Sequence, residues 1–341
     1  MIIVYSIFLY FFSTLLINKS IKLLNKFSLI DYPGLRSNHT SPTPKGAGII
    51  IIPLIIISTL ILLYFNKLLT ANWILVLLFC LLLSLVSFID DLKNLSTKVR
   101  LLFHFFIVAS SLFLFKNDII NLADSILNHI ESEQLFLVMF FLTIVFSFFW
   151  IWIINLYNFM DGMDGLTTLQ ICSVALLTNL LSLIGKVNIE YQILSLIILT
   201  VFIAFYKFNK SPAKVFLGDV GSISCGFLVG FIMISNFFYS DIIIPFLIIN
   251  MYYLLDSSIT LILRIITNQN IFQAHSSHFY QKIIRRGYSH EYVLKRIIIL
   301  NSLLLMLGIM STKFPISALF VSIILSLLLL YFFETRKSYE H

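Results

Sequence analysis

The sequence predicts an all-α protein that crosses a membrane many times. Of its 341 residues, 59% are hydrophobic and only 11% are charged. The apolar residues lie in runs of roughly 20, the length of helix that spans the hydrocarbon core of a bilayer. These runs lack the alternation of a membrane β-barrel, and helices are the other structure that satisfies the backbone in lipid. We therefore predict a single integral membrane domain over residues 1–341.

About eleven apolar segments are long enough to span. The first begins at Ile2, with no basic region before it and no small-residue cleavage site, which predicts a retained helix rather than a signal peptide. The others end where polar residues or glycine interrupt the apolar run, for example at Asn66, Asp90 and Gly185. The predicted spans are residues 2–18, 49–65, 73–89, 101–115, 135–154, 166–184, 191–208, 223–239, 242–263, 297–312 and 314–333.

Basic residues are distributed unevenly between the two sides that these spans define. If the spans alternate, 19 of the 23 Lys and Arg residues fall on one side. The positive-inside rule makes that side cytoplasmic, with the N-terminus outside and the C-terminus inside. The net charge of +7 is spread over these connections rather than gathered in one patch, so we expect no nucleic-acid partner. The three cysteines lie in apolar stretches without disulfide or zinc spacing and are predicted core residues.

Five unusual polar segments all fall on the predicted cytoplasmic side. Because they come from five different helix pairs, their convergence predicts an active site at the inner membrane surface. They are residues 36–48 (RSNHTSPTPKGAG), the pair Asp90-Asp91, residues 155–166 (NLYNFMDGMDGL), residues 209–222 (NKSPAKVFLGDVGS) and residues 267–291.

In the third of these segments, polar side chains recur every three residues, at Asn155, Asn158, Asp161 and Asp164. On a helical turn they would form a slanting polar stripe. Carboxylates and carboxamides together suit a uracil, a ribose or a hydrated cation, because their hydrogen bonds are directional. The alternative is that the stripe only caps two helices.

Three other acids are candidates. Asp90 and Asp91 project about 100° apart on a helix, so one can face the site while the other faces a basic partner or the outer shell of a metal. A pair of solvated charges at a helix end is the alternative. Asp219 lies between glycines where a span begins, and it suits either a helix cap or a Mg²⁺ ligand.

Histidines and one lysine add groups that can contact phosphate. His275 and His278 share a helical face if their segment is helical, and phosphate contact is favoured over zinc because no third ligand has suitable spacing. Lys45 is a cation on a loop stiffened by prolines, suited to a phosphate or equally to a topology signal. No chemistry is assigned to His39, His104 and His290, for which the sequence shows no distinguishing partner.

Asp256 is the one acid well inside a predicted span. Carboxylates within a membrane are functional candidates by default, yet Asp256 can also simply pair with Arg264 two turns later. The sequence leaves both interpretations open.

The motifs RSNHTSPTPKGAG, FIDD, NLYNFMDGMDGL, SPAKVFLGDVGS and AHSSHFYQ, in this order, resemble one family. They are similar to the polyprenyl-phosphate N-acetylhexosamine-1-phosphate transferases of glycosyltransferase family 4. The peptidoglycan enzyme phospho-N-acetylmuramoyl-pentapeptide transferase is a distant relative. The resemblance covers nearly the whole chain, and five ordered motifs are far more specific than any one of them.

The resemblance implies a multi-pass enzyme of the bacterial inner membrane with its active site on the cytoplasmic face. Such an enzyme transfers an N-acetylhexosamine 1-phosphate from a UDP-sugar to undecaprenyl phosphate and releases UMP. Mg²⁺ is the implied cofactor, with Mn²⁺ as a substitute, and a homodimer is one assembly open to such a protein.

The resemblance also implies roles for individual residues. Asp90 would deprotonate or position the lipid phosphate with Asp91 as its partner, and Asp219 would bind magnesium. The remaining matches are assigned to the nucleotide pocket and to phosphate handling. They are Asn158, Asp161, Asp164 and Asn209 for the nucleotide, and His275 and His278 for phosphate. Lys45 falls where the family has a basic residue before its glycines.

One motif departs from the commonest patterns of the family. HSSHFYQ lacks the consecutive histidines of the peptidoglycan enzyme and the H-x-H-H-R form of the enterobacterial and teichoic-acid branches, and it is closer to the O-antigen branch. The donor sugar therefore stays open. A transporter or flippase of lipid-linked sugars is the alternative function, and it would place its key charges near the bilayer midplane within inverted repeats.

Overall fold

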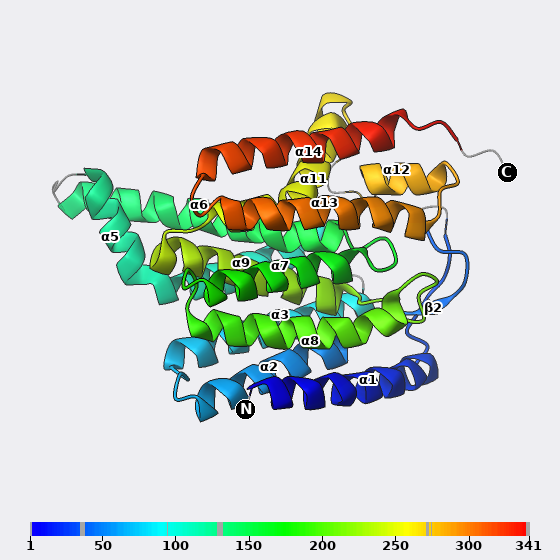
Figure 1. Cartoon of the computed structure of the whole chain (residues 1–341), viewed down its shortest axis with the longest axis horizontal. Helices are drawn as coiled ribbons and strands as arrows, with labels where there is room; N and C mark the ends of the chain where they lie inside the picture. The colour runs from blue at the N-terminus through cyan, green and yellow to red at the C-terminus, as the bar shows by residue number, and fades with distance from the viewer. Residues whose placement is uncertain are drawn as a thin grey trace.

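The computed structural model is a bundle whose long helices run roughly along one axis (Figure 1). It describes residues 2–34, 38–93, 95–127, 132–270, 273 and 275–338. Arg36, which begins the first of the polar segments, lies outside them. The helices are α1 (Ile2–Lys26), α2 (Gly48–Phe65), α3 (Ala71–Lys93), α4 (Thr97–Leu112), the short 3-10 helix η1 (Phe113–Phe115), α5 (Lys116–Leu127), α6 (Ser132–Phe159), α7 (Leu166–Leu183), α8 (Ile189–Asn209), α9 (Asp219–Ser240), α10 (Ile244–Ile249), α11 (Met251–Ile266), α12 (Phe279–Arg285), α13 (His290–Met310) and α14 (Pro315–Thr335).

The predicted all-α membrane fold is confirmed. Within the described ranges the only strands are β1 (Ile30–Asp31) and β2 (Thr43–Pro44), which form a small antiparallel pair. Ten helices there are long and apolar enough to cross a membrane. They account for every predicted span except that at 242–263, and one of them, Thr97–Ile126, runs from α4 through η1 into α5.

Helix α9 lies at the centre of the bundle, packed against α6, α3 and α2. In its most apolar stretch 94% of the residues are buried, the largest share among the spanning helices. A Cβ on Gly230 would overlap the indole ring of Trp150, whose Nε1–H donates to the Phe227 carbonyl (2.9 Å). Glycine thus lets α6 and α9 approach closely, as small residues do between membrane helices.

The span predicted at 242–263 is wrong as a single helix, because the chain breaks at Asn250 into α10 and α11. The Asn250 side chain accepts hydrogen bonds from Tyr157 (2.8 Å) and Gln170 (3.1 Å) and donates to the Phe246 carbonyl (2.9 Å). Gln170 also donates to the Ile249 carbonyl (2.9 Å). Side chains from α6 and α7 thus satisfy the polar groups at the break, which lipid could not do.

Replacing Asn250 with leucine should therefore destabilise the protein. Tyr157 and Gln170 would each lose a buried partner, which costs on the order of 1–3 kcal/mol in the free energy of unfolding. Thermal denaturation in detergent should show a lower Tm for Asn250→Leu and an unchanged Tm for Asn25→Leu at an exposed position of α1. Equal Tm values for the two variants would contradict a stabilising role for the network.

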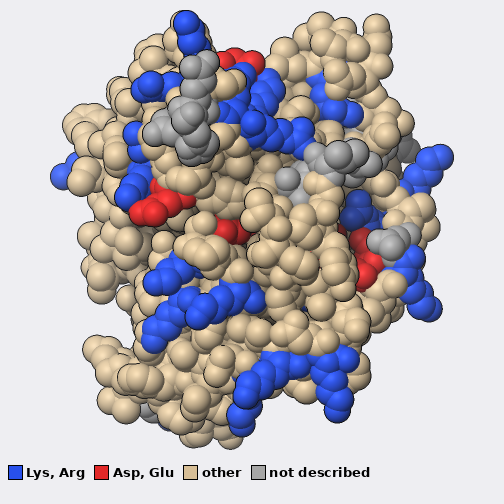
Figure 2. All heavy atoms as spheres, turned by 90° about the vertical axis from the view of Figure 1, so that its right-hand side faces the viewer, with Lys and Arg blue, Asp and Glu red and all other residues tan. Residues whose placement is uncertain are grey.

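The polar segments singled out in the sequence gather at one end of the bundle, the right-hand end in Figure 1, where the C-terminus also lies. Viewed from that end, Lys and Arg side chains are spread over the surface, and a few acidic side chains lie among them (Figure 2). The predicted convergence of motifs is thus present in the fold.

Candidate active site

The chain before α2 lies directly against the chain before α9. The Gly48 N–H donates to the Leu217 carbonyl (2.9 Å). A Cβ on Gly48 would overlap the backbone of Gly221, so this contact requires glycine. The contact brings Lys45 and Asp219, 174 residues apart in sequence, within 3.2 Å of each other.

Three aspartates and two cationic side chains form a charge cluster here. The Lys45 Nζ lies 2.7 Å from Asp91 Oδ1 and 3.2 Å from Asp219 Oδ1. The Arg100 guanidinium lies 3.0 Å from Asp90 Oδ2 and 3.5 Å from Asp219 Oδ2. Burial alone would lower the pKa of Lys45, but the two carboxylates beside it raise that pKa above its ordinary value. Lys45 is therefore a fixed cation at neutral pH.

The carboxylates of Asp90 and Asp91 diverge, as their helical spacing predicts. Asp90 is buried, binds Arg100 and accepts from the Leu95 N–H (2.7 Å), whereas Asp91 binds Lys45. Each acid thus has its own basic partner. No local sequence pattern distinguishes Arg100 from the other basic residues of the predicted cytoplasmic connections, so sequence reasoning missed its role here.

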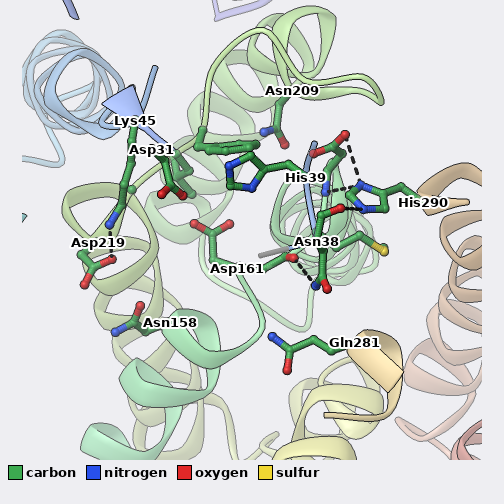
Figure 3. A pocket seen from close by; sticks show the side chains of 16 residues that line it. Asp31, Asn38, His39, Lys45, Asn158, Asp161, Asn209, Asp219, Gln281 and His290 are labelled. Carbon is green, nitrogen blue, oxygen red and sulfur yellow. Dashed lines mark hydrogen bonds and ion pairs between the residues drawn. The ribbon is translucent and has the colours of Figure 1, made fainter. Parts of the chain in front are cut away.

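A polar cavity of about 270 Å³ adjoins this cluster (Figure 3). In Figure 3 the Asp161 carboxylate projects toward its middle, with Asn158 and Asp219 on one side and Gln281 below. The polar side chains that line the cavity are Asp31, Asn38, His39, Lys45, Asn158, Asp161, Asp164, Asn209, Asp219, Gln281 and His290. Five of these belong to the predicted substrate-binding set.

Asp161 is the most perturbed acid in this cavity. Burial raises its pKa from 3.8 to about 7, with the negative charges of Asp219 and Asp91 adding to the effect against a hydrogen bond from Thr167 and the charge of Lys45. Asp161 therefore changes its charge near neutral pH.

This shift predicts a pH dependence of stability. Because the pKa is raised in the folded state, protonated Asp161 stabilises the fold fully below about pH 4, and the contribution is lost as pH rises through about 7. In EDTA, the Tm of the wild type should fall across this range relative to that of Asp161→Asn, which has no proton to lose. Parallel Tm curves for the two proteins would show that the pKa of Asp161 is not raised.

Asp164 lies in the wall of the cavity rather than at its centre. Its carboxylate is 3.2 Å from His290 Nδ1 and accepts from the Ala213 N–H (3.2 Å). Burial would raise the pKa of Asp164, but its bond to His290 and the charge of that ring lower it overall. His290 also contacts the Asn38 carbonyl (2.8 Å), and the Asn38 amide donates to the Gly162 carbonyl (2.9 Å). The expectation that His290 has no distinguishing partner is therefore wrong.

The Asn209 side chain links two segments of the site by hydrogen bonds. Its carbonyl oxygen accepts from the Gly165 N–H (3.1 Å) and the Thr168 hydroxyl (2.9 Å), and its amide donates to the Val215 carbonyl (3.2 Å). Asn209 thus ties the DGMDG turn to the segment that carries Asp219, while still lining the cavity.

A second, larger cavity of about 560 Å³ shares Asn158, Asp161 and Asp219 with the first. Asn155 lines it and donates to the Ile151 carbonyl (2.8 Å). Two kinds of side chain line this second cavity. The basic ones are Arg100, His104, His275 and His278. The large apolar ones are Leu101, Phe148, Ile151, Trp152, Phe159 and Leu261.

The two predicted phosphate-contacting histidines lie side by side, with ring centroids 5.1 Å apart. Burial, with His278 and Arg264 nearby, lowers the pKa of His275 to about 4. His278 is buried, and its Nδ1 lies 3.1 Å from Asp256. Arg264 instead donates to Gln269 (2.9 Å) and to a backbone carbonyl, so the pairing of Asp256 with Arg264 is wrong.

The acidic side of the cluster suits a hard cation. Asp91 Oδ2 is buried and has no hydrogen-bond partner within the ranges that the structure describes. No group of three or more His, Cys, Asp or Glu side chains in those ranges is placed to hold a metal. A metal at Asp219 would therefore use one or two carboxylates and take its other ligands from water and phosphate, which is the usual coordination of Mg²⁺.

A family profile and several known proteins match this chain, in agreement with the resemblance of its motifs. The sequence profile of glycosyl transferase family 4 matches residues 73–236, a segment that contains both charge-cluster acids of α3, the DGMDG turn and Asp219. A probable undecaprenyl-phosphate N-acetylglucosaminyl 1-phosphate transferase of Bacillus subtilis is 28% identical over 149 residues, 41% of either chain.

Two phospho-N-acetylmuramoyl-pentapeptide-transferases are also similar. The protein of Lactococcus lactis subsp. cremoris is 28% identical over 233 residues, 63% of this chain and 64% of that protein. The protein of Buchnera aphidicola is 27% identical over 326 residues, 86% of this chain and 87% of that protein. The chain thus spans less than two thirds of the first two relatives and most of the third. With the motifs assembled around one pair of cavities, these matches show that the chain is similar to glycosyl transferase family 4 over residues 73–236.

Proposed function

We propose that this protein transfers an N-acetylated hexosamine 1-phosphate from a UDP-sugar to undecaprenyl phosphate. The products would be the lipid-diphosphate sugar and UMP, in the first membrane step of O-antigen or another surface polysaccharide. One observation carries the proposal: a polar cavity and a partly apolar cavity meet at Asn158, Asp161 and Asp219, beside the charge cluster.

The first cavity suits the nucleotide of the donor. Its wall is held by hydrogen bonds among Asp164, His290, Asn38 and Gly162, so its polar groups are fixed before a ligand arrives. Such preorganised donors and acceptors recognise a uracil or ribose without a large ordering cost. The diphosphate would then extend toward Lys45 and Asp219.

The second cavity suits the acceptor lipid. Apolar side chains of α4, α6 and α11 would contact the isoprenoid chain, while Arg100, His275 and His278 would face its phosphate. In this arrangement the lipid phosphate and the donor diphosphate would lie on either side of the shared residues, as a direct or two-step phosphoryl transfer requires.

Attack of one phosphate on another must overcome repulsion between two anions, so positioning and fixed cations matter more than a strong base. The lipid phosphate is largely ionised at neutral pH because its second pKa is about 6. Asp90, already bound to Arg100 and the Leu95 N–H, is therefore suited to orienting groups rather than abstracting a proton. Mg²⁺ held at Asp219, with Mn²⁺ as a substitute, would neutralise charge on the departing UMP.

The proposal places the reaction on the cytoplasmic face of the bacterial inner membrane. Most of the basic residues lie in connections on the same side as the charge cluster when the spans alternate. The UDP-sugar would then be taken from the cytoplasm and the acceptor from the bilayer.

A reconstituted assay tests the proposal. Purified protein with undecaprenyl phosphate and Mg²⁺ should release UMP from at least one member of a radiolabelled panel of UDP-N-acetylhexosamines and transfer its label to lipid. The donor that reacts would also identify the sugar. Release of UMP without lipid, or movement of lipid-linked sugar across vesicles without any chemistry, would overturn the proposal, the second result in favour of a transporter.

A further inference from the structure

Behind His278, which lines the second cavity, lies a buried carboxylate that the proposed reaction does not use. Asp256 of α11 is fully buried, and it accepts from the Phe279 N–H (3.1 Å) and the Tyr280 N–H (3.4 Å). The hydroxyls of Tyr252 (3.3 Å) and Thr260 (3.4 Å) donate to it as well. Apart from these neutral donors, its only side-chain partner among the described residues that can carry a positive charge is His278.

His278 Nδ1 lies 3.1 Å from Asp256 Oδ1, with the exposed fractions of the two side chains at 3% and 0%. Because a carboxylate only accepts hydrogen bonds, Nδ1 carries the proton in this contact. The His278 ring also lies nearly parallel to the ring of Tyr280 (centroids 5.9 Å apart, 22°). The ring is thus fixed in orientation, with a proton on Nδ1.

His278 lines the second cavity. Because Nδ1 is engaged by Asp256, Nε2 is the ring nitrogen left to contact a ligand there. A buried carboxylate without a compensating charge is costly, and a doubly protonated imidazole would compensate it. In that form Nε2 is an N–H donor, the group that binds a phosphate oxygen in a charge-assisted hydrogen bond.

We propose that Asp256 is a positioning residue, which holds the imidazole of His278 so that its Nε2 binds a phosphate oxygen in the second cavity. The inference rests on the proposed function for the identity of that phosphate, but the contact itself does not. The competing role is purely structural, since Asp256 also accepts from the first N–H groups of α12.

Replacing His278 with asparagine or glutamine distinguishes the positioning role of Asp256 from a purely structural one. In His278→Asn the amide can replace Nδ1–H against Asp256 while Nε2 is lost, whereas in His278→Gln the amide can replace Nε2 while the contact with Asp256 is lost. His278→Asn should therefore keep the Tm of the wild type and lose kcat for UMP release by about 100-fold, on the order of the loss when one preorganised hydrogen-bond donor is removed. Wild-type kcat in His278→Asn would overturn the proposal.

A double-mutant cycle then tests whether Asp256 acts through His278. Asp256→Asn should lower kcat by roughly 10–100-fold in the wild type and by no more than about twofold when His278→Gln is already present, because the contact between the two side chains is then already lost. Asp256→Glu should recover part of the loss. Equal losses from Asp256→Asn in both backgrounds would show a structural role and overturn the proposal.

The control is Asp241→Asn, an exposed position with φ 53° at the opposite end of α9, where asparagine tolerates the same backbone. It should leave kcat and Tm unchanged. The Tm values of the same four proteins test the contact without any turnover. Asp256→Asn should lower Tm less in the His278→Gln background than in the wild type. Fully additive decreases in Tm would overturn the pairing. A wild type that releases no UMP from any donor would refute the proposed function, and the Tm cycle would still report on the pair.

Discussion

Asp219→Asn is expected to lower the rate of UMP release by about 100-fold or more, on the order of the loss when one preorganised electrostatic group is removed. The carboxylate lies beside Lys45 and Arg100 and lines both cavities. Replacing it with an amide of the same shape removes charge where the donor diphosphate and Mg²⁺ would meet. The rate should be measured against Mg²⁺ concentration with undecaprenyl phosphate and the reactive donor.

The same substitution should weaken metal binding itself. Titration of Mn²⁺ followed by electron paramagnetic resonance should show a lower affinity in Asp219→Asn, whether or not the enzyme turns over. Asp241→Asn, at the far end of the same helix, should retain both the rate and the affinity. Unchanged metal dependence in Asp219→Asn would exclude Asp219 as a ligand.

Arg100→Ala should have the second-largest effect. Arg100 binds both Asp90 and Asp219, and its side chain is only 28% exposed. Its loss removes a cation that faces the acceptor cavity and leaves a buried carboxylate without its partner. We expect kcat to fall by about 100-fold and the free energy of unfolding to fall by up to about 3–5 kcal/mol, the upper range for breaking a buried pair.

Arg100→Lys separates these two contributions. A lysine keeps the charge but cannot bridge two carboxylates as a planar guanidinium does, so Tm should recover more than kcat. Lys98→Ala, an exposed basic residue in the same turn of α4, should change neither quantity. Equal activity of Arg100→Ala and Lys98→Ala would show that Arg100 serves only membrane topology.

Much of the predicted site depended on local sequence. Asn158, Asp161 and Asp164 all line the polar cavity, as the polar pattern of their segment suggested. The predicted helical stripe is wrong, however, because α6 ends at Phe159 and α7 begins at Leu166, which leaves Asp161 and Asp164 in a non-helical connection. The pair Asp90-Asp91 diverges as adjacent helical positions must. This divergence follows from helical geometry between adjacent residues, so the sequence predicts it directly. The assignment of these residues to substrates stays a prediction.

The ninth predicted span contains a helix break that hydropathy does not predict. The apolar run over 242–263 is long enough to cross a bilayer, yet the chain breaks at Asn250. The break depends on Tyr157 and Gln170 of two other helices, which supply hydrogen bonds to the interrupted backbone and to Asn250 itself. A hydropathy window contains no information about those partners.

By itself the sequence determined that this protein is an all-α membrane protein similar to one family, because apolar length and motif order are properties of the chain alone. Only the tertiary structure decided which side chains pair. Arg100 meets Asp219 across 119 residues, and the Asp164 backbone meets His290 across 126. Asp256 meets His278 rather than the nearer Arg264. The physical reason is that ion pairs and hydrogen bonds depend on distance in space, which helix packing sets and sequence separation does not.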